Sequence, residues 1–332
     1  MEKESIRKKI DKWSLRIIGI ILLTLIIADM SITLLFAGKI PHRFASAEEG
    51  KDLLMSNTAY YDNMTQNDID YRSGKHSAAK EELMSASAEE IRDFNFAEKY
   101  LMDRCIAGMA LKLKLKGHTL PLKEEIVYIK TGMKTEGGNA GYTHGTQIYL
   151  EPVNIMLSIF PGGYFENLMW HELFHCLTRN DPDFRADMYS LINFRTADAD
   201  FEIPPCIKDR YFSNPDVEHH DAYASFTVDG RKTDCFLVWI CKRDYPDDGS
   251  SPGWDNEPVL VPTDGTDTYY TREQASDFDE VFGRNTYYVI DPEECMADNF
   301  ADAMQYGIKG KNGEGYPDPQ IIQGVIDSVS GK

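Results

Sequence analysis

The stretch HELFH at residues 171–175 indicates both a central helix of the fold and a metal site on that helix. It lies within residues 164–178, which are apolar almost all round and predict a helix buried on most of its faces. Residues four apart share one face of a helix, so His171 and His175 can reach a single metal ion. Glu172 can take a proton from a water molecule at that metal. Two imidazoles, one further protein ligand and an open position are typical of catalytic zinc, so we expect Zn²⁺ as the cofactor.

The alternative interpretation of this stretch is a pair of histidines that are hydrogen-bonded within a core. It requires a buried partner for each of three polar side chains on a mostly apolar helix. The motif arises by chance in roughly one or two chains per hundred of this composition. Chance seldom also places it on a buried helix that follows a strand, which favours the metal site.

The third protein ligand is expected on a second helix, which opens at Pro292 and runs to about Tyr306. Glu294 and Asp298 are four residues apart and share one face of that helix. Glu294 can complete the metal shell, while Asp298 accepts the free N–H of one ligand imidazole and fixes its tautomer. The alternative is an acidic helix start that is stabilised by the helix dipole.

With these two helices, the chain resembles the gluzincin group of zinc metallopeptidases, in which a helix bearing ExxxD joins the HExxH helix. The resemblance implies a zincin-like fold, with His171, His175 and Glu294 as metal ligands, Glu172 as general base and Asp298 as the residue that orients a ligand. It covers the two motif helices and the strand before them. The 118 residues between the two motifs form a wider gap than compact members of the group have.

Asp181 is the rival third ligand. Metzincins extend the motif as HExxHxxGxxH or with aspartate at the last position, where this chain has Asp181. Thr178 replaces the glycine of that pattern, at a point where the chain must turn sharply and a β-branched residue disfavours positive φ. We therefore expect Asp181 to cap a helix that starts near Pro182.

Accessory groups are less distinctive. Tyr288, just before the Glu294 helix, is the first candidate for stabilising an oxyanion, with a packed ring as the alternative. The strand predicted within residues 143–150 precedes the metal helix and is expected to pair with an extended peptide substrate, with an ordinary sheet strand as the alternative. Simple surface, loop or hydrogen-bonding roles are expected for His144, His219, His220, Asp244, Asp247, Asp248 and Asp255.

The charge separates a leader from a body. The chain carries 54 acidic and 35 basic side chains, a net charge of −19, which disfavours a nucleic-acid partner. Residues 1–47 carry +4, so the remainder carries −23.

The leader is expected to meet a membrane. After basic residues ending at Arg16, the apolar run 17–37 is long enough to cross a bilayer. Its thirteen Ile, Leu and Phe residues favour insertion by about 6 kcal/mol in sum, against about 3 kcal/mol for Asp29. The basic flank predicts a cytoplasmic N-terminus and an exported body. Residues 45–47, Ala-Ser-Ala, also form a possible cleavage site, so a signal peptide and a membrane anchor both stay open.

The remaining pattern predicts an α+β chain in three parts: a signal peptide or anchor over 1–47, a stalk or lead-in over 48–86, and a zincin-like domain over 87–332. That domain is expected to contain a small mixed sheet, and a β-hairpin insertion around 200–285. A capping box at Ser87 and Glu90 predicts the start of a helix that runs to about Gly117. Six cysteines permit up to three disulfides in an exported body, with buried thiols as the alternative.

These features predict a zinc-dependent hydrolase outside the cytoplasm, either secreted or membrane-anchored. The expected reaction is cleavage of peptide bonds in a peptide or protein substrate, with Glu172 assisting the attack of water. A non-catalytic exported binding module with a vestigial or structural zinc site is the alternative from another class. A zinc hydrolase of non-peptide amides would have the same motifs.

Overall fold

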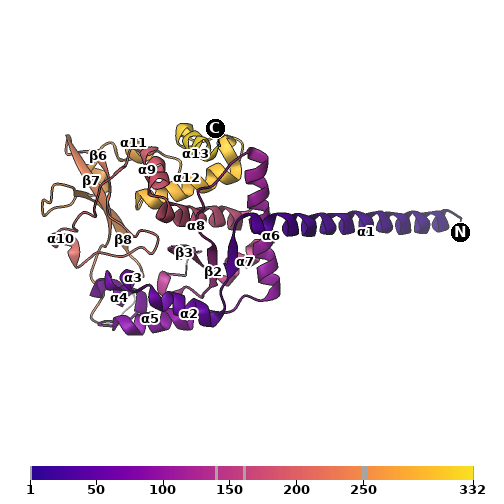
Figure 1. Cartoon of the computed structure of the whole chain (residues 1–332), viewed down its shortest axis with the longest axis horizontal. Coiled ribbons are helices and arrows are strands. Elements are labelled where there is room, and N and C mark those ends of the chain that lie inside the picture. The colour runs from indigo at the N-terminus through magenta and orange to yellow at the C-terminus, as the bar shows by residue number, and fades with distance from the viewer. Residues whose placement is uncertain (1, 139–140, 160–161, 249–252, 332) are drawn as a thin grey trace.

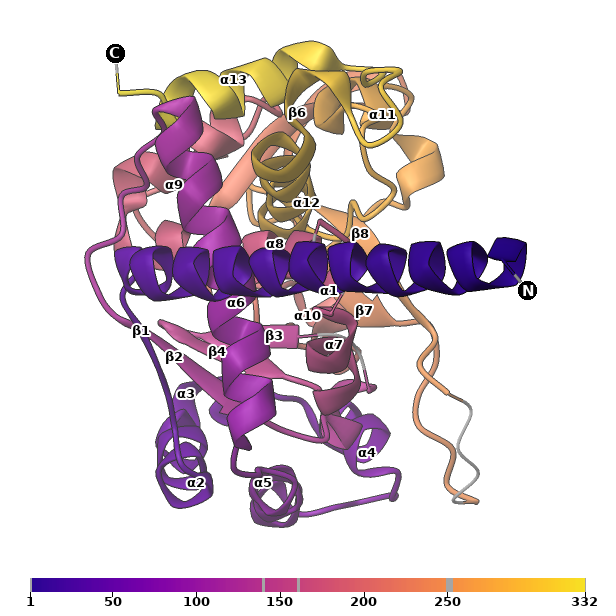
Figure 2. The ribbon, with the colours of Figure 1, turned by 90° about the vertical axis from the view of Figure 1, so that its right-hand side faces the viewer.

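The computed structural model describes residues 2–138, 141–159, 162–248 and 253–331 and has a mixed α/β fold. A long apolar helix, α1 (Glu2–Phe36), leads to a body in which helices and a sheet lie in layers (Figure 1). From one side to the other these layers are the short helices after α1, a mixed sheet, α8, α12 and α13, and a second sheet lies at the end of the body away from α1 (Figures 1 and 2).

The first sheet is small and mixed, as the sequence predicted. Its strand order is β1-β2-β4-β3, with β3 antiparallel to β4 and the other pairs parallel. Ile126 and Tyr128 of β2 face the main core, and Val127 and Ile129 face the short helices, because successive strand residues point to opposite faces. The four strands are β1 (His42–Phe44), β2 (Ile126–Lys130), β3 (Gly141–His144) and β4 (Gln147–Leu150).

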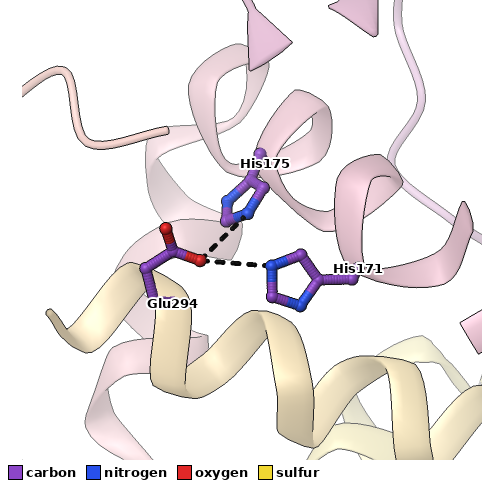
Figure 3. A group of neighbouring side chains, drawn as sticks. All are labelled: His171, His175 and Glu294. Atoms are coloured by element: carbon purple, nitrogen blue, oxygen red, sulfur yellow. Dashed lines mark hydrogen bonds and ion pairs between the residues drawn. The ribbon is translucent and has the colours of Figure 1, made fainter. Parts of the chain in front are cut away.

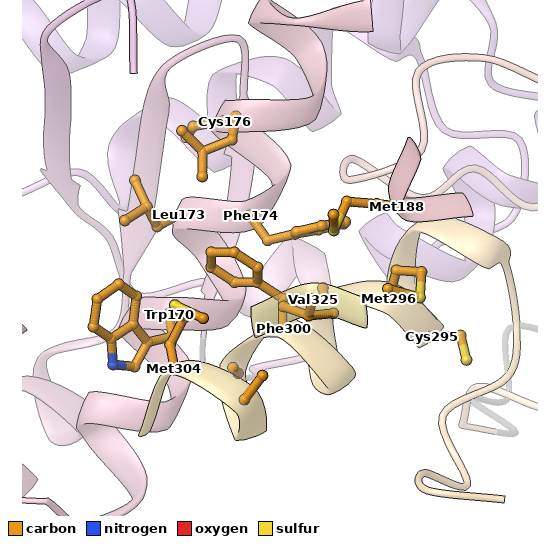
Figure 4. Packing of buried hydrophobic residues seen from close by; sticks show 14 of the residues in the cluster. Trp170, Leu173, Phe174, Cys176, Met188, Cys295, Met296, Phe300, Met304 and Val325 are labelled. Atoms are coloured by element: carbon orange, nitrogen blue, oxygen red, sulfur yellow. The ribbon is translucent and has the colours of Figure 1, made fainter. Parts of the chain in front are cut away.

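The main core lies between this sheet and three helices. The predicted metal helix is α8 (Tyr164–Asn180), and the predicted second helix is α12 (Pro292–Tyr306). Figure 4 shows Trp170 and Phe174 of α8 in one buried cluster with Phe300 and Met304 of α12 and Val325 of α13 (Pro319–Val329). This packing of wholly buried rings and aliphatic chains holds the two motif helices against each other.

The segment after α1 differs from the expected stalk or lead-in, because it packs closely on the body. Its four short helices are α2 (Ala47–Ser56), α3 (Thr58–Asp62), α4 (Gln66–Ser73) and α5 (Lys80–Glu89). Leu54 and Ile91 are buried with Ile129 under the first sheet. None of these helices is long enough to show a sustained apolar stripe in the sequence.

The next helix, α6 (Phe96–Lys116), starts later than predicted. The capping box is formed by Asn95 and Glu98, whose side chains each accept a hydrogen bond from the other's backbone N–H. Ser87 instead lies in the last turn of α5 and donates to the carbonyl of Leu83. The helix continues without a break through Gly108.

The predicted hairpin belongs to a larger antiparallel sheet, with strand order β5-β6-β7-β8. Its turn is Asp229-Gly230, with φ of 46° and 80°, which a tight two-residue hairpin turn requires. The strands are β5 (Arg195–Thr196), β6 (Ala222–Val228), β7 (Arg231–Cys241) and β8 (Asn256–Pro262). The remaining elements are α7 (Pro152–Leu157), α9 (Pro182–Ser190), α10 (Pro205–Lys208), α11 (Phe278–Phe282) and the 3₁₀ turns η1 (Ala37–Lys39), η2 (Lys134–Glu136), η3 (Arg272–Gln274) and η4 (Gly307–Lys309).

All six cysteines lie in the described part of the chain, and none of them forms a disulfide. Cys235 and Cys241 lie on the same strand, β7, and cannot reach each other. Four of the six are buried thiols, Cys105 is half-buried and Cys206 is exposed.

Candidate metal centre

The two motif helices bring the three predicted ligands together. His171 and His175 face the first turn of α12, where Glu294 points back at them (Figure 3). Oε2 of Glu294 lies 3.1 Å from Nε2 of His171 and 3.6 Å from Nε2 of His175. One ligand atom from each residue lies within 4.8 Å of the other two. Tetrahedral zinc with bonds of about 2.0–2.1 Å separates its ligand atoms by about 3.3 Å, so the donor set fits that ion.

A second observation supports the fit. Nε2 of His175 is buried and has no hydrogen-bond partner among the described residues. The other ring nitrogen, Nδ1, lies 2.8 Å from Oε1 of Glu293. Because a buried ring nitrogen without a partner is costly, this arrangement leaves Nε2 free for a metal ion.

Each ligand imidazole is oriented by its own carboxylate. Oδ1 of Asp298 lies 3.0 Å from Nδ1 of His171, which is the role that the sequence suggested for Asp298. Glu293 has the same role at His175, and it also accepts hydrogen bonds from the hydroxyls of Thr178 and Tyr189. Carboxylates in this position fix the tautomer and raise the basicity of a ligand.

Glu293 was not among the predicted site residues. The second histidine of the motif also needs a partner for its free N–H, and Glu293 precedes the predicted ligand Glu294. That requirement was the one signal in the sequence for this residue.

The second carboxylate oxygen of Glu294 is held in place by two groups. Oε1 accepts a hydrogen bond of 2.6 Å from the Asn214 side chain and one of 3.3 Å from the Tyr288 hydroxyl. The Tyr288 ring also lies 6.2 Å from the ring of His171, so this tyrosine belongs to the site. Asn214 comes from a loop, and no motif in the sequence marks it.

Glu172 lies beside the ligand His175. It is buried, and its Oε2 has no hydrogen-bond partner within the described ranges. Gly141 of β3 makes room for it, since a Cβ there would lie 2.6 Å from Oε1 of Glu172. Burial, and then the nearby charge of Asp216, raises the pKa of Glu172 to about 8. A carboxylate with a pKa near neutrality is suited to accept and return a proton.

Asp216 is a second site residue that was not predicted. Its carboxylate is buried, and one ligand atom from each of Asp216, Glu172 and His175 lies within 4.8 Å of the others. Oδ1 accepts hydrogen bonds from the backbone N–H of Thr143 at 2.7 Å and from the Thr143 hydroxyl at 2.6 Å. A loop residue therefore reaches both the edge of the first sheet and the metal centre.

This contact bears on the strand predicted within residues 143–150. The segment is not one strand, because Gly145, with φ of 57°, turns the chain between β3 and β4. β3 is one of the two edge strands of the sheet, but the N–H of Thr143 is already bonded to Asp216. An extended peptide gains that donor only if it displaces the Asp216 carboxylate.

The protonation of the ligands reflects the excess of carboxylates around them. Burial alone would lower the pKa of His175, but Asp216, Glu293 and Glu294 outweigh burial and raise it to about 10. Burial also opposes ionisation of Glu294, yet its hydrogen bond with His171 and the nearby imidazole of His175 hold its pKa below the usual range. The site thus favours positive charge among its carboxylates, which a divalent cation would provide.

The other candidate residues lie outside the group of three metal ligands. Asp181 caps α9, accepts a hydrogen bond from the N–H of Phe184 and pairs with Lys123 at 2.9 Å, so it is a cap and not part of the ligand group. The ring of His144 is buried against tyrosines, and His219 pairs with Asp200.

Comparisons of the chain with protein-family models, with curated proteins and with solved structures give no match.

Proposed function

We propose that the protein is a zinc-dependent hydrolase, a metallopeptidase of the gluzincin type that cleaves peptide bonds. One observation carries this proposal: Glu294 meets His171 and His175 at spacings that suit tetrahedral zinc, while Glu172 lies beside them with a free oxygen. His171, His175 and Glu294 would hold Zn²⁺. When bound, the ion supplies a Lewis acid that activates water and polarises the scissile carbonyl.

Glu172 acts as the proton carrier in this proposal. Its free Oε2 takes a proton from the attacking water, and the same oxygen then returns the proton to the leaving amine. A pKa of about 8 in the absence of metal falls when a cation sits beside it, which leaves the carboxylate ionised and ready to act as a base.

Tyr288 is the candidate for stabilising negative charge on the substrate. Its hydroxyl now donates a hydrogen bond to Glu294, and its ring lies beside that of His171. By turning away from Glu294, the hydroxyl can donate to the oxygen of the scissile carbonyl as charge develops there. A single donor of this kind contributes about 10²–10³ in kcat.

The position of Asp216 favours the alternative, which is a non-catalytic module with a structural zinc site. Its carboxylate shares a group with His175 and Glu172, so it can supply a fourth protein ligand and close the shell. Structural zinc sites have four protein ligands, whereas catalytic ones keep an exchangeable position. Against this alternative, Oδ1 of Asp216 is already engaged by two donors from Thr143, and a structural site has no use for Glu172.

The test combines metal content, cobalt spectroscopy and hydrolysis. We expect the full chain to retain about one zinc ion, to cleave a quenched-fluorescent peptide library, and to lose cleavage on chelation. Cobalt in place of zinc should give a spectrum that changes when a hydroxamate is added, because a hydroxamate enters an exchangeable position. Metal bound without cleavage, and a cobalt spectrum that does not respond, would support the structural site. Cleavage of simple amides but not peptides would replace the peptidase with an amidase.

A further inference from the structure

Asp29 is the one charged residue in the apolar run 17–37, and the folded body neutralises it. Its carboxylate accepts a hydrogen bond of 3.0 Å from the Tyr100 hydroxyl and lies 3.1 Å from Nε of Arg104, both on α6. An acidic residue deep in a bilayer is costly, but one at the body end of the helix and paired with arginine is not. One face of the last turns of α1 therefore packs on the body, with Thr33 buried, while Leu34 and Leu35 of the same turns stay exposed.

The possible cleavage site is also built into the fold. Ala45 is 3% exposed and its N–H donates to the carbonyl of Tyr128 in the first sheet. Ser46 caps α2, accepting a hydrogen bond from Glu49. Cleavage after Ala47 would remove β1 from its place beside β2. The structure thus favours an α1 that stays attached to the body over a leader that is removed.

Beside this anchor lies an exposed apolar ridge, which we call the α7 ridge: Val153, Met156 and Leu157 of α7, and Ile159 just after it. Between 40% and 63% of each of these side chains is exposed. Nη2 of Arg104, the residue that pairs with Asp29, donates a hydrogen bond of 3.2 Å to the carbonyl of Ile159. A single guanidinium therefore joins the ridge to α1. In Figure 2, α7 lies below α1, to the right of the point where α1 crosses α6.

The length of α1 brings the ridge to the membrane surface. The apolar run between Arg16 and Asp29 has 12 residues. At 1.5 Å per residue it spans about 18 Å, less than the roughly 30 Å of a bilayer's hydrocarbon core. A span shorter than the bilayer is accommodated by local thinning of the bilayer and by flanking charged side chains that reach outward to its surface. The groups level with Asp29 then enter the membrane interface, and the α7 ridge is one of them.

The charge distribution also indicates that the side of the body that carries α6 faces the membrane. The body carries −23, yet α6, the helix that α1 crosses, has five basic and two acidic residues. Lys99 and Lys114 of α6 are exposed. A basic helix on an otherwise acidic body suits phosphate head groups, which attract lysines close to the surface.

We propose that the α7 ridge is a second membrane contact, inserted at the boundary between head groups and acyl chains of the bilayer that α1 crosses. The occupant of this face is lipid. Exposed apolar side chains next to an apolar helix, with lysines on the neighbouring element, are the composition of an interfacial contact. The body is then held flat against the membrane by two contacts rather than hanging from one helix.

The test places nitroxide labels on the full chain in vesicles of phosphatidylcholine and phosphatidylglycerol. Single cysteines replace Met156 on the ridge, Leu25 on α1 and Arg231 at the tip of the hairpin, in a background in which the exposed Cys206 is serine. Oxygen partitions into lipid and a nickel chelate into water, so their collision rates with each label report its depth. We expect the Met156 and Leu25 labels to favour oxygen and the Arg231 label to favour nickel. Val153→Cys repeats the ridge measurement if Met156→Cys folds poorly.

Each other outcome overturns the proposal. A ridge label that favours nickel while the Leu25 label favours oxygen would mean that α1 is inserted and the ridge is in water. A ridge label shielded from both reagents, with spin–spin broadening, would mean that a second copy of the chain covers the ridge. If the Leu25 label also favours nickel, α1 is not in the membrane and the argument from its length fails.

Discussion

The substitution Glu293→Gln tests the candidate site most selectively, because Glu293 contacts the ligand His175 without being a metal ligand itself. Its Oε1 lies 2.8 Å from Nδ1 of His175, and it also accepts hydrogen bonds from the hydroxyls of Thr178 and Tyr189. Glu293→Gln keeps the shape but replaces one acceptor oxygen with a donor NH₂ among three donors. Two consequences follow, one for metal affinity and one for the stability of the fold.

The affinity consequence comes from losing the carboxylate that orients the imidazole. Loss of such a partner weakens metal binding by about 10- to 100-fold, or about 1.4–2.7 kcal/mol. The stability consequence comes from at least one buried donor that loses its acceptor, which costs about 1–3 kcal/mol in the metal-free protein. The assays are zinc competition with a chromogenic chelator and urea unfolding in the presence of EDTA.

Asp181→Ala is the matched control, because it also removes a carboxylate at the end of α8. It breaks the α9 cap, so it should destabilise the protein by about 0.5–2 kcal/mol and leave zinc affinity unchanged. Zinc affinity that is unaltered in Glu293→Gln, despite the loss of stability, would refute the orienting role. Loss of zinc in Asp181→Ala would refute the ligand set itself.

Three further predictions concern other parts of the chain. Tyr288→Phe should lower kcat by about 10²–10³ with little change in zinc content, measured by peptide hydrolysis, and a change in KM alone would speak against an oxyanion donor. Gly141→Ala should push Glu172 aside and reduce kcat/KM at least about 10-fold, since its Cβ would lie 2.6 Å from that carboxylate; full activity would show that Glu172 has room to move. Although burial acts the other way, Lys232 and two hydrogen bonds lower the pKa of Asp277 to about 2, below the value of about 3.9 for an unfolded chain. Asp277→Asn should therefore cost about 1–2 kcal/mol near pH 7, after allowance for its partial exposure, and the difference from wild type in urea unfolding should shrink as the pH falls from about 4 toward 2. A difference that persists in acid would contradict this account.

The elements that the sequence located well carry strong local signals. The apolar character of residues 164–178 and the proline at 292 set α8 and α12, and Asp229-Gly230 set the hairpin turn. The start of α6 was misplaced because two capping boxes compete eight residues apart. Ser87 lies in the last turn of α5, where its hydroxyl bonds to a carbonyl within the same helix, and this leaves Asn95 as the cap.

The candidate site likewise contains residues that the sequence predicted and residues that it did not. The histidines, Glu294 and Asp298 follow helical spacing, which local geometry fixes. Asn214 and Asp216 come from a loop that is folded over the edge of the first sheet, and only tertiary structure brings them to the site. The short helices over residues 47–89 were not predicted for a related reason: they are stabilised by packing against the first sheet and against one another rather than by long apolar stripes.

The central claim is that this is a catalytic zinc site in which Glu172 is the base. The most direct measurement compares zinc content and peptide hydrolysis for the wild-type chain and Glu172→Gln in matched preparations. Glutamine keeps the shape of the side chain but cannot accept the proton of the attacking water. We expect about one zinc ion per chain in both proteins, hydrolysis by the wild type, and a loss of at least about 10³-fold in the variant. Equal hydrolysis by the two proteins, or a wild-type chain that retains no zinc, would contradict the claim.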